Sequence, residues 1–279
     1  MKVVRTVAEL RDTVEVSRRQ GRTIGFVPTM GALHAGHLSL VEAARSQDDI
    51  VVVSIFVNPL QFGPTEDLAA YPRPEEDDLA AARAAGVDLV FLPSVEEMYP
   101  PGRATEIETG PVAIPLEGAA RPGHFSGVAT VVAKLLNLVQ PDRLYLGQKD
   151  AQQVAVIKTL VRDLSFPVDV VVCPTVREPD GLALSSRNAY LEGRQRATAT
   201  VLWRALEAGR RELGAGERAE AVEEKMRAMV TGERGAELDY AAVVDPDSFG
   251  APADGGPYLL VLAVRVGRAR LIDNMRVEL

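Results

Sequence analysis

The chain has 279 residues, 47% of them apolar and 25% charged, which is typical of a globular protein with one or two domains. The formal net charge of −8 argues against a general nucleic-acid-binding surface, and the single cysteine excludes an intrachain disulfide. We expect that cysteine, Cys173, to be a small buried side chain. No apolar run approaches the roughly 20 residues of a membrane span, and the N-terminus carries charge too early for a signal peptide, so we expect a soluble, cytoplasmic protein.

The first ninety residues alternate helical and strand-like patterns. The run I-V-V-V-S-I-F-V at 50–57 is nearly continuous in β-branched residues, which is typical of a strand buried on both faces of a parallel sheet. The alternation predicts a doubly wound parallel sheet, in which the loops that follow the strands share one edge and bind ligands there. The strands are expected at 23–27, 50–57 and 87–92, and the helices at 6–20, 37–47 and 75–85.

The rest of the chain continues this pattern and then changes character. A polar, turn-rich passage begins near residue 176, and after it two long helices precede three strands, which predicts a smaller α+β domain. An irregular β segment is expected at 105–117 and a small-residue loop at 121–127. The remaining elements are expected as helices at 128–139, 151–164, 189–213 and 217–230, and as strands at 143–146, 168–173, 238–244, 258–266 and 269–273.

A short loop at the end of the first predicted strand holds two histidines among small residues. In P-T-M-G-A-L-H-A-G-H, His34 and His37 stand three residues apart just before a helix. Free N–H groups and the positive end of the helix dipole suit such a loop to a phosphate-bearing ligand. The pair could also be a helix cap or part of the core. With His124 it could hold zinc, although the acidic residue of H-E-x-x-H is missing.

Three further polar clusters follow predicted strands. Each is a weak signal by itself, because a solvated Lys–Asp pair or a helix-capping serine would look the same. Arginine with serine also suits a phosphate clamp, and neutral glutamine amides suit a small polar acid. Neither a Walker loop nor a G-x-G-x-x-G loop is present. The clusters are Asn58 with Gln61, Gln148 with Lys149 and Asp150, and Ser185 with Ser186 and Arg187, and Gln153 lies near the same edge.

Taken together, these motifs resemble those of a known family. H-x-G-H, then K-D, then S-S-R is the order of the nucleotidyltransferase superfamily, which includes the class I aminoacyl-tRNA synthetases. Within it, P-T-M-G-A-L-H-A-G-H, F-V-N-P-L-Q-F-G, R-P-G-H-F-S-G, Y-L-G-Q-K-D-A-Q-Q and L-S-S-R-N resemble the pantothenate synthetase (pantoate–β-alanine ligase) family. These blocks run from residue 28 to residue 188, and the spacing of the remainder also fits.

The resemblance implies an ATP-dependent ligase that condenses (R)-pantoate with β-alanine through a pantoyl adenylate and releases pyrophosphate and AMP. It implies a Rossmann-like ATP- and pantoate-binding domain at 1–175 and a smaller α+β domain at 176–279 that closes over the site. It also implies Mg²⁺ carried by the ATP phosphates, no metal held by the protein, and a homodimer. A simple nucleotidyltransferase and a non-catalytic nucleotide-binding protein are the alternatives.

The resemblance also assigns roles to individual residues. The catalytic residues would be His34, His37, Lys149 and Arg187, with His37 as the family's proton donor. Pantoate would be held by Gln61 and Gln153, with Asn58 and His124 as weaker candidates. The ATP-binding residues would be Met30, Gly31, Ala32, Leu33, His34, Ala35, Gly36, His37, Gly147, Gln148, Lys149, Asp150, Val176, Leu184, Ser185, Ser186 and Arg187.

Three further expectations concern Leu184, the segment 64–73 and an acidic pair. Leu184 stands where many members have methionine, a swap that nearly conserves volume and leaves the backbone contact in place. The segment 64–73 would be a mobile flap that shields the adenylate from water. Asp77 and Asp78 resemble an acidic pair that is sometimes near a metal, but we expect them to be a solvated helix start and leave them outside the site.

Overall fold

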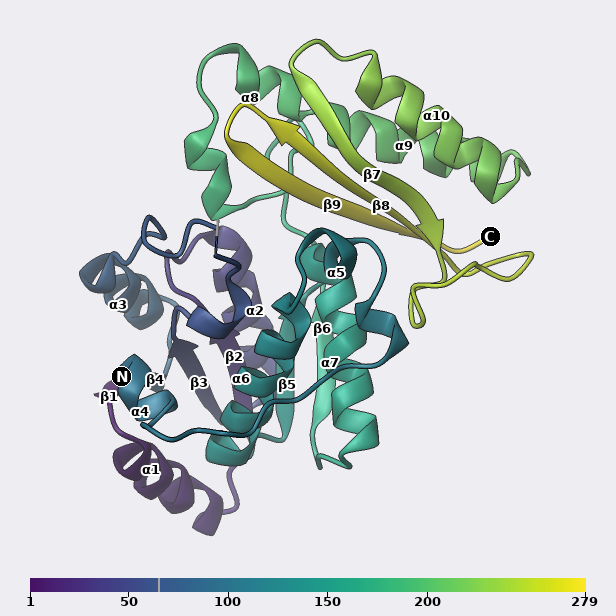
Figure 1. Cartoon of the computed structure of the whole chain (residues 1–279). Coiled ribbons are helices and arrows are strands. Elements are labelled where there is room, and N and C mark those ends of the chain that lie inside the picture. The colour runs from purple at the N-terminus through teal and green to yellow at the C-terminus, as the bar shows by residue number, and fades with distance from the viewer. Residues whose placement is uncertain (65) are drawn as a thin grey trace. The chain divides into compact units, whose positions relative to one another are not determined.

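The computed structural model describes residues 1–64 and 66–279, which separate into two compact units (Figure 1). Unit 1 comprises Met1–Gly147 and Val156–Cys173, and it contains a parallel sheet. Unit 2 comprises Gln148–Ala155 and Pro174–Leu279, and it contains an antiparallel sheet.

The sheet of unit 1 has six strands in the order β1-β4-β3-β2-β5-β6, and every neighbouring pair is parallel. The order reverses between β2 and β5, which is where doubly wound sheets bind ligands. The predicted α/β class is therefore confirmed, and the loops after β2, β3 and β4 leave from one edge. The strands are β1 (Lys2–Val4), β2 (Ile24–Thr29), β3 (Ile50–Ile55), β4 (Leu89–Phe91), β5 (Arg143–Gly147) and β6 (Asp169–Cys173).

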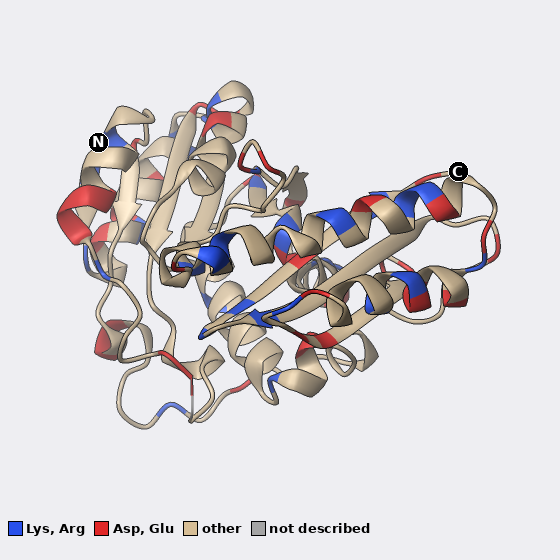
Figure 2. Ribbon diagram, turned by 90° about the horizontal axis from the view of Figure 1, so that it is seen from above, with Lys and Arg blue, Asp and Glu red and all other residues tan. Residues whose placement is uncertain are grey.

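Helices bury both faces of this sheet. Phe26 and Val27 are consecutive in β2 and both are fully buried, although their side chains leave opposite faces of the strand. Val27 packs with α2 and α3 residues in one cluster, and α6 contacts both β2 and α1. Most charged segments lie on helices and loops (Figure 2). The helices are α1 (Val7–Arg19), α2 (Ala35–Gln47), α3 (Glu75–Ala84), α4 (Val95–Met98), α5 (Glu117–Ala120), α6 (His124–Val139) and α7 (Ala151–Asp163), with short 3-10 helices η1 (Pro59–Gln61) and η2 (Pro111–Ala113).

Unit 2 places two helices along one face of its three-stranded sheet (Figure 1). The helices and strands share one apolar core, so the predicted α+β character of the C-terminal part is confirmed. The helix expected at 189–213 is divided by Gly193, whose φ of 51° lies in the left-handed region, and by Thr200. The elements are η3 (Gln148–Asp150), η4 (Ser186–Tyr190), α8 (Arg194–Ala199), α9 (Val201–Gly214), α10 (Ala219–Thr231), β7 (Ala236–Val244), β8 (Tyr258–Val266) and β9 (Ala269–Val277).

Three local predictions in unit 1 are wrong. The segment expected as β at 105–117 forms no strand and contains the 3-10 helix η2 and the first residue of α5, and the short edge strand β1 was not predicted. The helix expected at 128–139 begins at His124, because the small residues before it are part of its first turn rather than a loop. Gly127 is small for a packing reason: a Cβ there would lie 2.3 Å from the Leu60 carbonyl oxygen of η1.

Replacing Gly127 by alanine is expected to lower the free energy of unfolding by about 1–3 kcal/mol, the usual cost of overpacking. The added Cβ would meet backbone atoms of Leu60 and Gln61, and these cannot rotate away. Gly214, at the end of α9, has no neighbouring atom within 4 Å of the place that a Cβ would take, so Gly214→Ala is the matched control. Urea denaturation of both variants tests this, and equal stabilities would contradict it.

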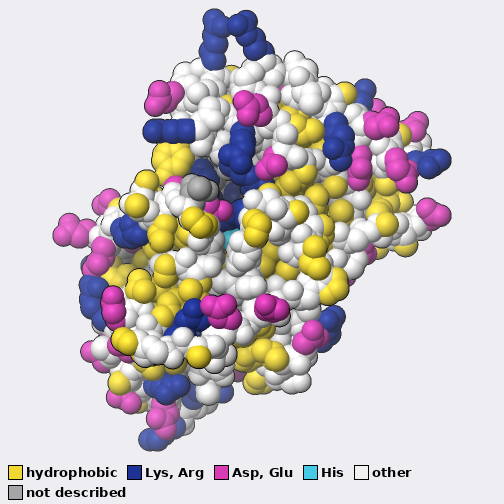
Figure 3. Space-filling view, viewed as in Figure 1, with side chains coloured by type: hydrophobic (Ala, Val, Ile, Leu, Met, Phe, Trp, Pro, Cys, Tyr) yellow, Lys and Arg dark blue, Asp and Glu magenta, His cyan; other side chains and the backbone are white. Residues whose placement is uncertain are grey.

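The described helices include none that is both long and apolar enough to cross a membrane. On the face that Figure 3 shows, basic and acidic side chains are interspersed, as expected from the composition.

Candidate active site

The loop that joins β2 to α2 has a tightly constrained backbone. Gly31 has a φ of 84° and Ala32 a φ of 50°, so a residue with a Cβ adopts the left-handed conformation that normally favours glycine. The N–H groups of Ala32 and Leu33 donate to the two carboxylate oxygens of Asp78, at 2.9 and 2.6 Å. Asp78 is only 2% exposed, so the expectation that it belongs to a solvated helix start is wrong. The Asp78 carboxylate therefore fixes the backbone of the loop between β2 and α2.

The two histidines cap the start of α2 reciprocally. His34 is the N-cap residue, and its Nδ1 accepts from the Gly36 N–H at 3.1 Å. His37 Nδ1 accepts from the His34 N–H at 3.4 Å, and the ring centroids lie 4.1 Å apart. A ring nitrogen that accepts carries no proton, so in each neutral ring Nε2 is the protonated nitrogen. Both imidazoles therefore have a donor at Nε2.

This arrangement changes the interpretation of the loop as a backbone phosphate cradle. The Gly31 N–H donates to Thr29 Oγ1 at 3.2 Å, and the next N–H groups donate to Asp78 and to the histidine rings. Most of the N–H groups that the sequence led us to expect for an anion are thus already bonded within the protein. An anion at this loop would therefore have to be bound mainly by side-chain donors.

Asn58 and Gln61, the polar pair after β3, lie next to each other and next to the histidine loop. Asn58 Nδ2 donates to Gln61 Oε1 at 3.0 Å, and Gln61 Nε2 lies 3.2 Å from the sulfur of Met30. The carbonyl oxygen of Gln61 contacts His124 Nδ1 at 2.9 Å and accepts from Arg121 at 3.2 Å. Tertiary contacts therefore bring four of the predicted site positions together in unit 1.

His124 lies between the Gln61 carbonyl and a guanidinium group. Arg121 Nη1 is 3.1 Å from His124 Nε2, and the same guanidinium makes a two-point ion pair with Glu66 at 2.7 and 2.6 Å. Burial, followed by the positive charge of Arg121, lowers the pKa of His124 to about 4. A neutral ring that donates from Nδ1 and accepts at Nε2 fits both neighbours. Both ring nitrogens are engaged, which argues against a zinc site made of the three histidines.

The pKa of His124 predicts a loss of stability in mild acid. A base with a folded-state pKa near 4 and an ordinary value near 6.5 binds protons more readily when the chain is unfolded, so stability falls as pH drops from 6.5 towards 4. The loss should reach about 2 kcal/mol at pH 5. His124→Asn keeps a donor for the Gln61 carbonyl but does not titrate. Urea denaturation at pH 7 and pH 5 should show the smaller loss in the variant, and parallel losses would contradict the assignment.

In unit 2, Asn274 of β9 positions the Gln148–Asp150 turn. It is 4% exposed, and its Nδ2 donates to the carbonyl oxygens of Gln148 and Lys149, both at 2.9 Å. Its Oδ1 accepts from Gln148 Nε2 at 3.0 Å. Lys149 Nζ lies 3.8 Å from Asp150, too far for a strong hydrogen bond. The sequence offered no sign of Asn274, which is far from this motif in the chain.

The cluster of Ser185, Ser186 and Arg187, the second predicted phosphate-binding segment of unit 2, is also held by hydrogen bonds within that unit. The Leu184 N–H donates to the Val176 carbonyl oxygen at 3.0 Å, which joins two of the predicted ATP-binding positions. Ser185 Oγ accepts from the Arg187 N–H at 3.3 Å, so this serine does cap a short helix, as the alternative interpretation held. Gln153 lies in α7 and is partly exposed.

Arg177, which follows Val176, was not among the functional residues predicted from the sequence. It makes a two-point ion pair with Asp273 at 2.6 and 2.9 Å, and it lies 4.3 Å from the centre of the Trp203 ring. Burial raises the pKa of Asp273, while Arg177 acts in the opposite direction. Since Asp273 precedes Asn274, this buried pair supports the strand that holds the Lys149 turn.

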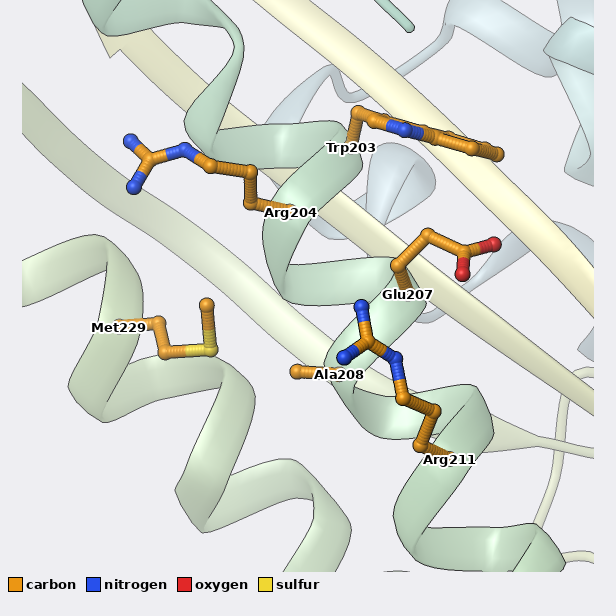
Figure 4. Close-up of a pocket in the computed structure, with 6 residues that line it drawn as sticks. All are labelled: Trp203, Arg204, Glu207, Ala208, Arg211 and Met229. Carbon is orange, nitrogen blue, oxygen red and sulfur yellow. The ribbon is translucent and has the colours of Figure 1, made fainter.

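A shallow cavity of about 480 Å³ opens between α9 and α10 (Figure 4). None of the predicted site residues lines it. Among the residues that the structure describes, no three His, Cys, Asp or Glu side chains gather where they could hold a metal ion. The cavity is lined by Trp203, Arg204, Glu207, Ala208, Arg211 and Met229.

Comparison with known proteins identifies the family. The family model of pantoate-beta-alanine ligase matches residues 2–276. The pantothenate synthetase of Herpetosiphon aurantiacus is 54% identical over 278 residues, covering 99% of each chain. That of Chloroflexus aurantiacus is 56% identical over 285 residues, covering 100% of this chain and 99% of the relative.

Solved structures agree with the sequence comparison. The crystal structure of pantothenate synthetase from Thermus thermophilus has a TM-score of 0.94 at 50% identity, with complete coverage of both chains. The Francisella tularensis pantoate-beta-alanine ligase, solved in complex with beta-gamma ATP and beta-alanine, has a TM-score of 0.83 at 38% identity and covers 99% of this chain and 97% of its own. The chain therefore belongs to the pantoate-beta-alanine ligase family.

Proposed function

We propose that this chain condenses (R)-pantoate with β-alanine, using ATP, to form pantothenate, AMP and pyrophosphate. The observation that carries the proposal is the family match from residue 2 to residue 276. The Francisella tularensis relative was solved with an ATP-type nucleotide and beta-alanine, which supports both substrates. The match spans all motif blocks, so it does not favour a simple nucleotidyltransferase or a non-catalytic binding protein.

In the first step, the pantoate carboxylate attacks the α-phosphorus of ATP and pyrophosphate leaves. Negative charge develops on phosphate oxygens, and donors that are held in advance stabilise it. In unit 1 we assign this role to the Nε2–H groups of His34 and His37. In unit 2 we assign it to Lys149 and Arg187. The nucleotide contacts that we propose are Met30, Gly31, Ala32, Leu33, His34, Ala35, Gly36, His37, Gly147, Gln148, Lys149, Asp150, Val176, Leu184, Ser185, Ser186 and Arg187.

In the second step, the amine of β-alanine attacks the acyl carbon of the adenylate and AMP leaves. This needs no protein nucleophile, because the adenylate is already an activated acyl group. We propose that Gln61 and Gln153 hold pantoate, since their neutral amides can bond its oxygens without adding charge.

Mg²⁺ would arrive on the ATP phosphates. Its preferred oxygen ligands are phosphates and water, supplemented by few protein groups. We further propose a cytoplasmic homodimer. The proposed 64–73 flap includes residue 65, which lies outside the described residues.

The reaction is tested with the purified chain, ATP, Mg²⁺, D-pantoate and β-alanine, by following AMP and pantothenate. Both products should form in equal amounts and depend on both acids. Pyrophosphate release that depends on pantoate, with no AMP or pantothenate formed when β-alanine is added, would instead favour a simple adenylyl transfer. No AMP above the control without pantoate would refute the function.

A further inference from the structure

The buried amide of Asn58 uses all of its hydrogen-bonding positions. Oδ1 accepts from the Leu60 N–H at 3.3 Å and from the Tyr99 hydroxyl at 2.8 Å. Nδ2 donates to the Gly127 carbonyl oxygen at 3.1 Å and to Gln61 Oε1 at 3.0 Å. Since a backbone N–H only donates and a backbone carbonyl only accepts, a reversed amide would face two mismatches. The backbone of η1 and α6 thus decides that Asn58 turns its NH₂ group towards Gln61.

The orientation of Asn58 determines that of Gln61. Gln61 must turn its carbonyl oxygen towards the Asn58 NH₂ group, so its own NH₂ group points the other way. The atom that it meets is the Met30 sulfur, at 3.2 Å, and a thioether is a weak acceptor. The main chain of Gln61 is held at the same time, because its carbonyl oxygen is bound by Arg121 and His124.

We propose that Asn58 is a positioning residue that fixes the polarity of the Gln61 amide, so that Gln61 presents N–H donors to pantoate. The proposal rests on the proposed function, which assigns Gln61 to pantoate. A carboxylate or hydroxyl oxygen is a better acceptor than the Met30 sulfur and would take its place. Asn58 itself is 1% exposed, so it acts through Gln61 and need not contact the substrate, in contrast to its expected role as a ligand.

The Tyr99 hydroxyl is the fourth hydrogen-bond partner of the Asn58 side chain. Since Asn58 Oδ1 is an acceptor, the Tyr99 hydroxyl is the donor, and burial raises the pKa of Tyr99, which keeps the proton on its oxygen. Its ring packs edge-on against Phe56 at 5.9 Å, and Arg103 lies 5.3 Å from its centre.

Asn58→Asp is the direct test, because it has nearly the same shape but no NH₂ group. Gln61 then gains a better partner by turning its NH₂ group towards residue 58, which leaves its carbonyl oxygen facing pantoate. The KM for pantoate should rise at least tenfold, while the KM for ATP should stay within twofold. An unchanged KM for pantoate, or an equal rise in both KM values, would overturn the proposal.

A double-mutant cycle separates positioning from general support. Once Gln61 is replaced by methionine, Asn58→Asp should raise the KM for pantoate no further, because it has no amide left to orient. If the two substitutions instead raised the KM for pantoate by factors that multiply, Asn58 would act independently of Gln61, and the proposal would be overturned. If Asn58→Asp does not fold, Asn58→Ala removes the same donor without a buried charge and enters the same cycle.

A measurement that does not depend on turnover distinguishes failure of the proposed role of Asn58 from failure of the proposed function. The side-chain amide resonance of Gln61 can be assigned by its loss in Gln61→Met. In Asn58→Asp one of its protons should shift downfield, because it exchanges a sulfur for a carboxylate acceptor. The absence of this shift would overturn the role of Asn58 even in an active enzyme. Absence of turnover in the wild type would refute the proposed function alone.

Discussion

His37→Ala should lower the rate of pantoyl-adenylate formation by about 10²–10³-fold, the usual effect of removing one preorganised donor to a developing oxyanion, or roughly 2.7–4 kcal/mol. The reason lies in the capping arrangement, which leaves Nε2 as the protonated nitrogen of the ring. The measurement is isotope exchange between pyrophosphate and ATP in the presence of pantoate, because this reports the first step alone.

Two partial replacements of His37 separate its two nitrogens. Glutamine places an NH₂ group near the position of Nε2, whereas asparagine places an acceptor near Nδ1 and can restore only the cap. His37→Gln should therefore recover at least tenfold over His37→Ala, and His37→Asn should recover little. The reverse order would assign the importance of His37 to the cap. No recovery by either variant would favour transfer of a proton from the ring over simple donation.

Asp78→Ala is expected to have the second large effect, on stability and catalysis together. It leaves the partly buried N–H groups of Ala32 and Leu33 without an acceptor, each at a cost of about 1–3 kcal/mol. It also releases the left-handed conformation of Ala32, which by itself costs about 1–3 kcal/mol and persists only when its surroundings enforce it. The histidines that follow would then lose their fixed placement.

Asp78→Asn provides a milder version, and Asp77→Asn provides the control on an exposed neighbour. Asp78→Asn retains one acceptor oxygen, so we expect a loss of about 1–3 kcal/mol in urea denaturation and at least tenfold in pyrophosphate exchange. Asp77→Asn should change neither quantity. Equal behaviour of the two variants would show that the buried carboxylate does not organise the loop.

Much of the architecture follows from local pattern. The β-branched run at 50–57 predicted a buried strand, and parallel strands leave their following loops at one edge, so the grouping of the His34 and Gln61 loops in unit 1 was foreseeable. The boundaries of helices were less predictable where a small residue is required by tertiary packing. Gly127 looked like part of a loop because nothing local indicates that α6 packs against η1 at that point.

The sequence by itself determined the class of fold and the residues with suitable chemistry, because side-chain periodicity and the types of polar residue after each strand are local properties. Only the tertiary structure decided how these residues are used. Asp78 reaches Ala32 across 46 positions, and Asn274 reaches Gln148 across 126. Neither partner is marked by its neighbours, because a buried hydrogen bond between distant segments leaves no periodic signal. The bonds to Asp78 occupy backbone donors of the histidine loop. In the reaction that we propose, the phosphates are therefore bound mainly by side chains, including the imidazoles of His34 and His37.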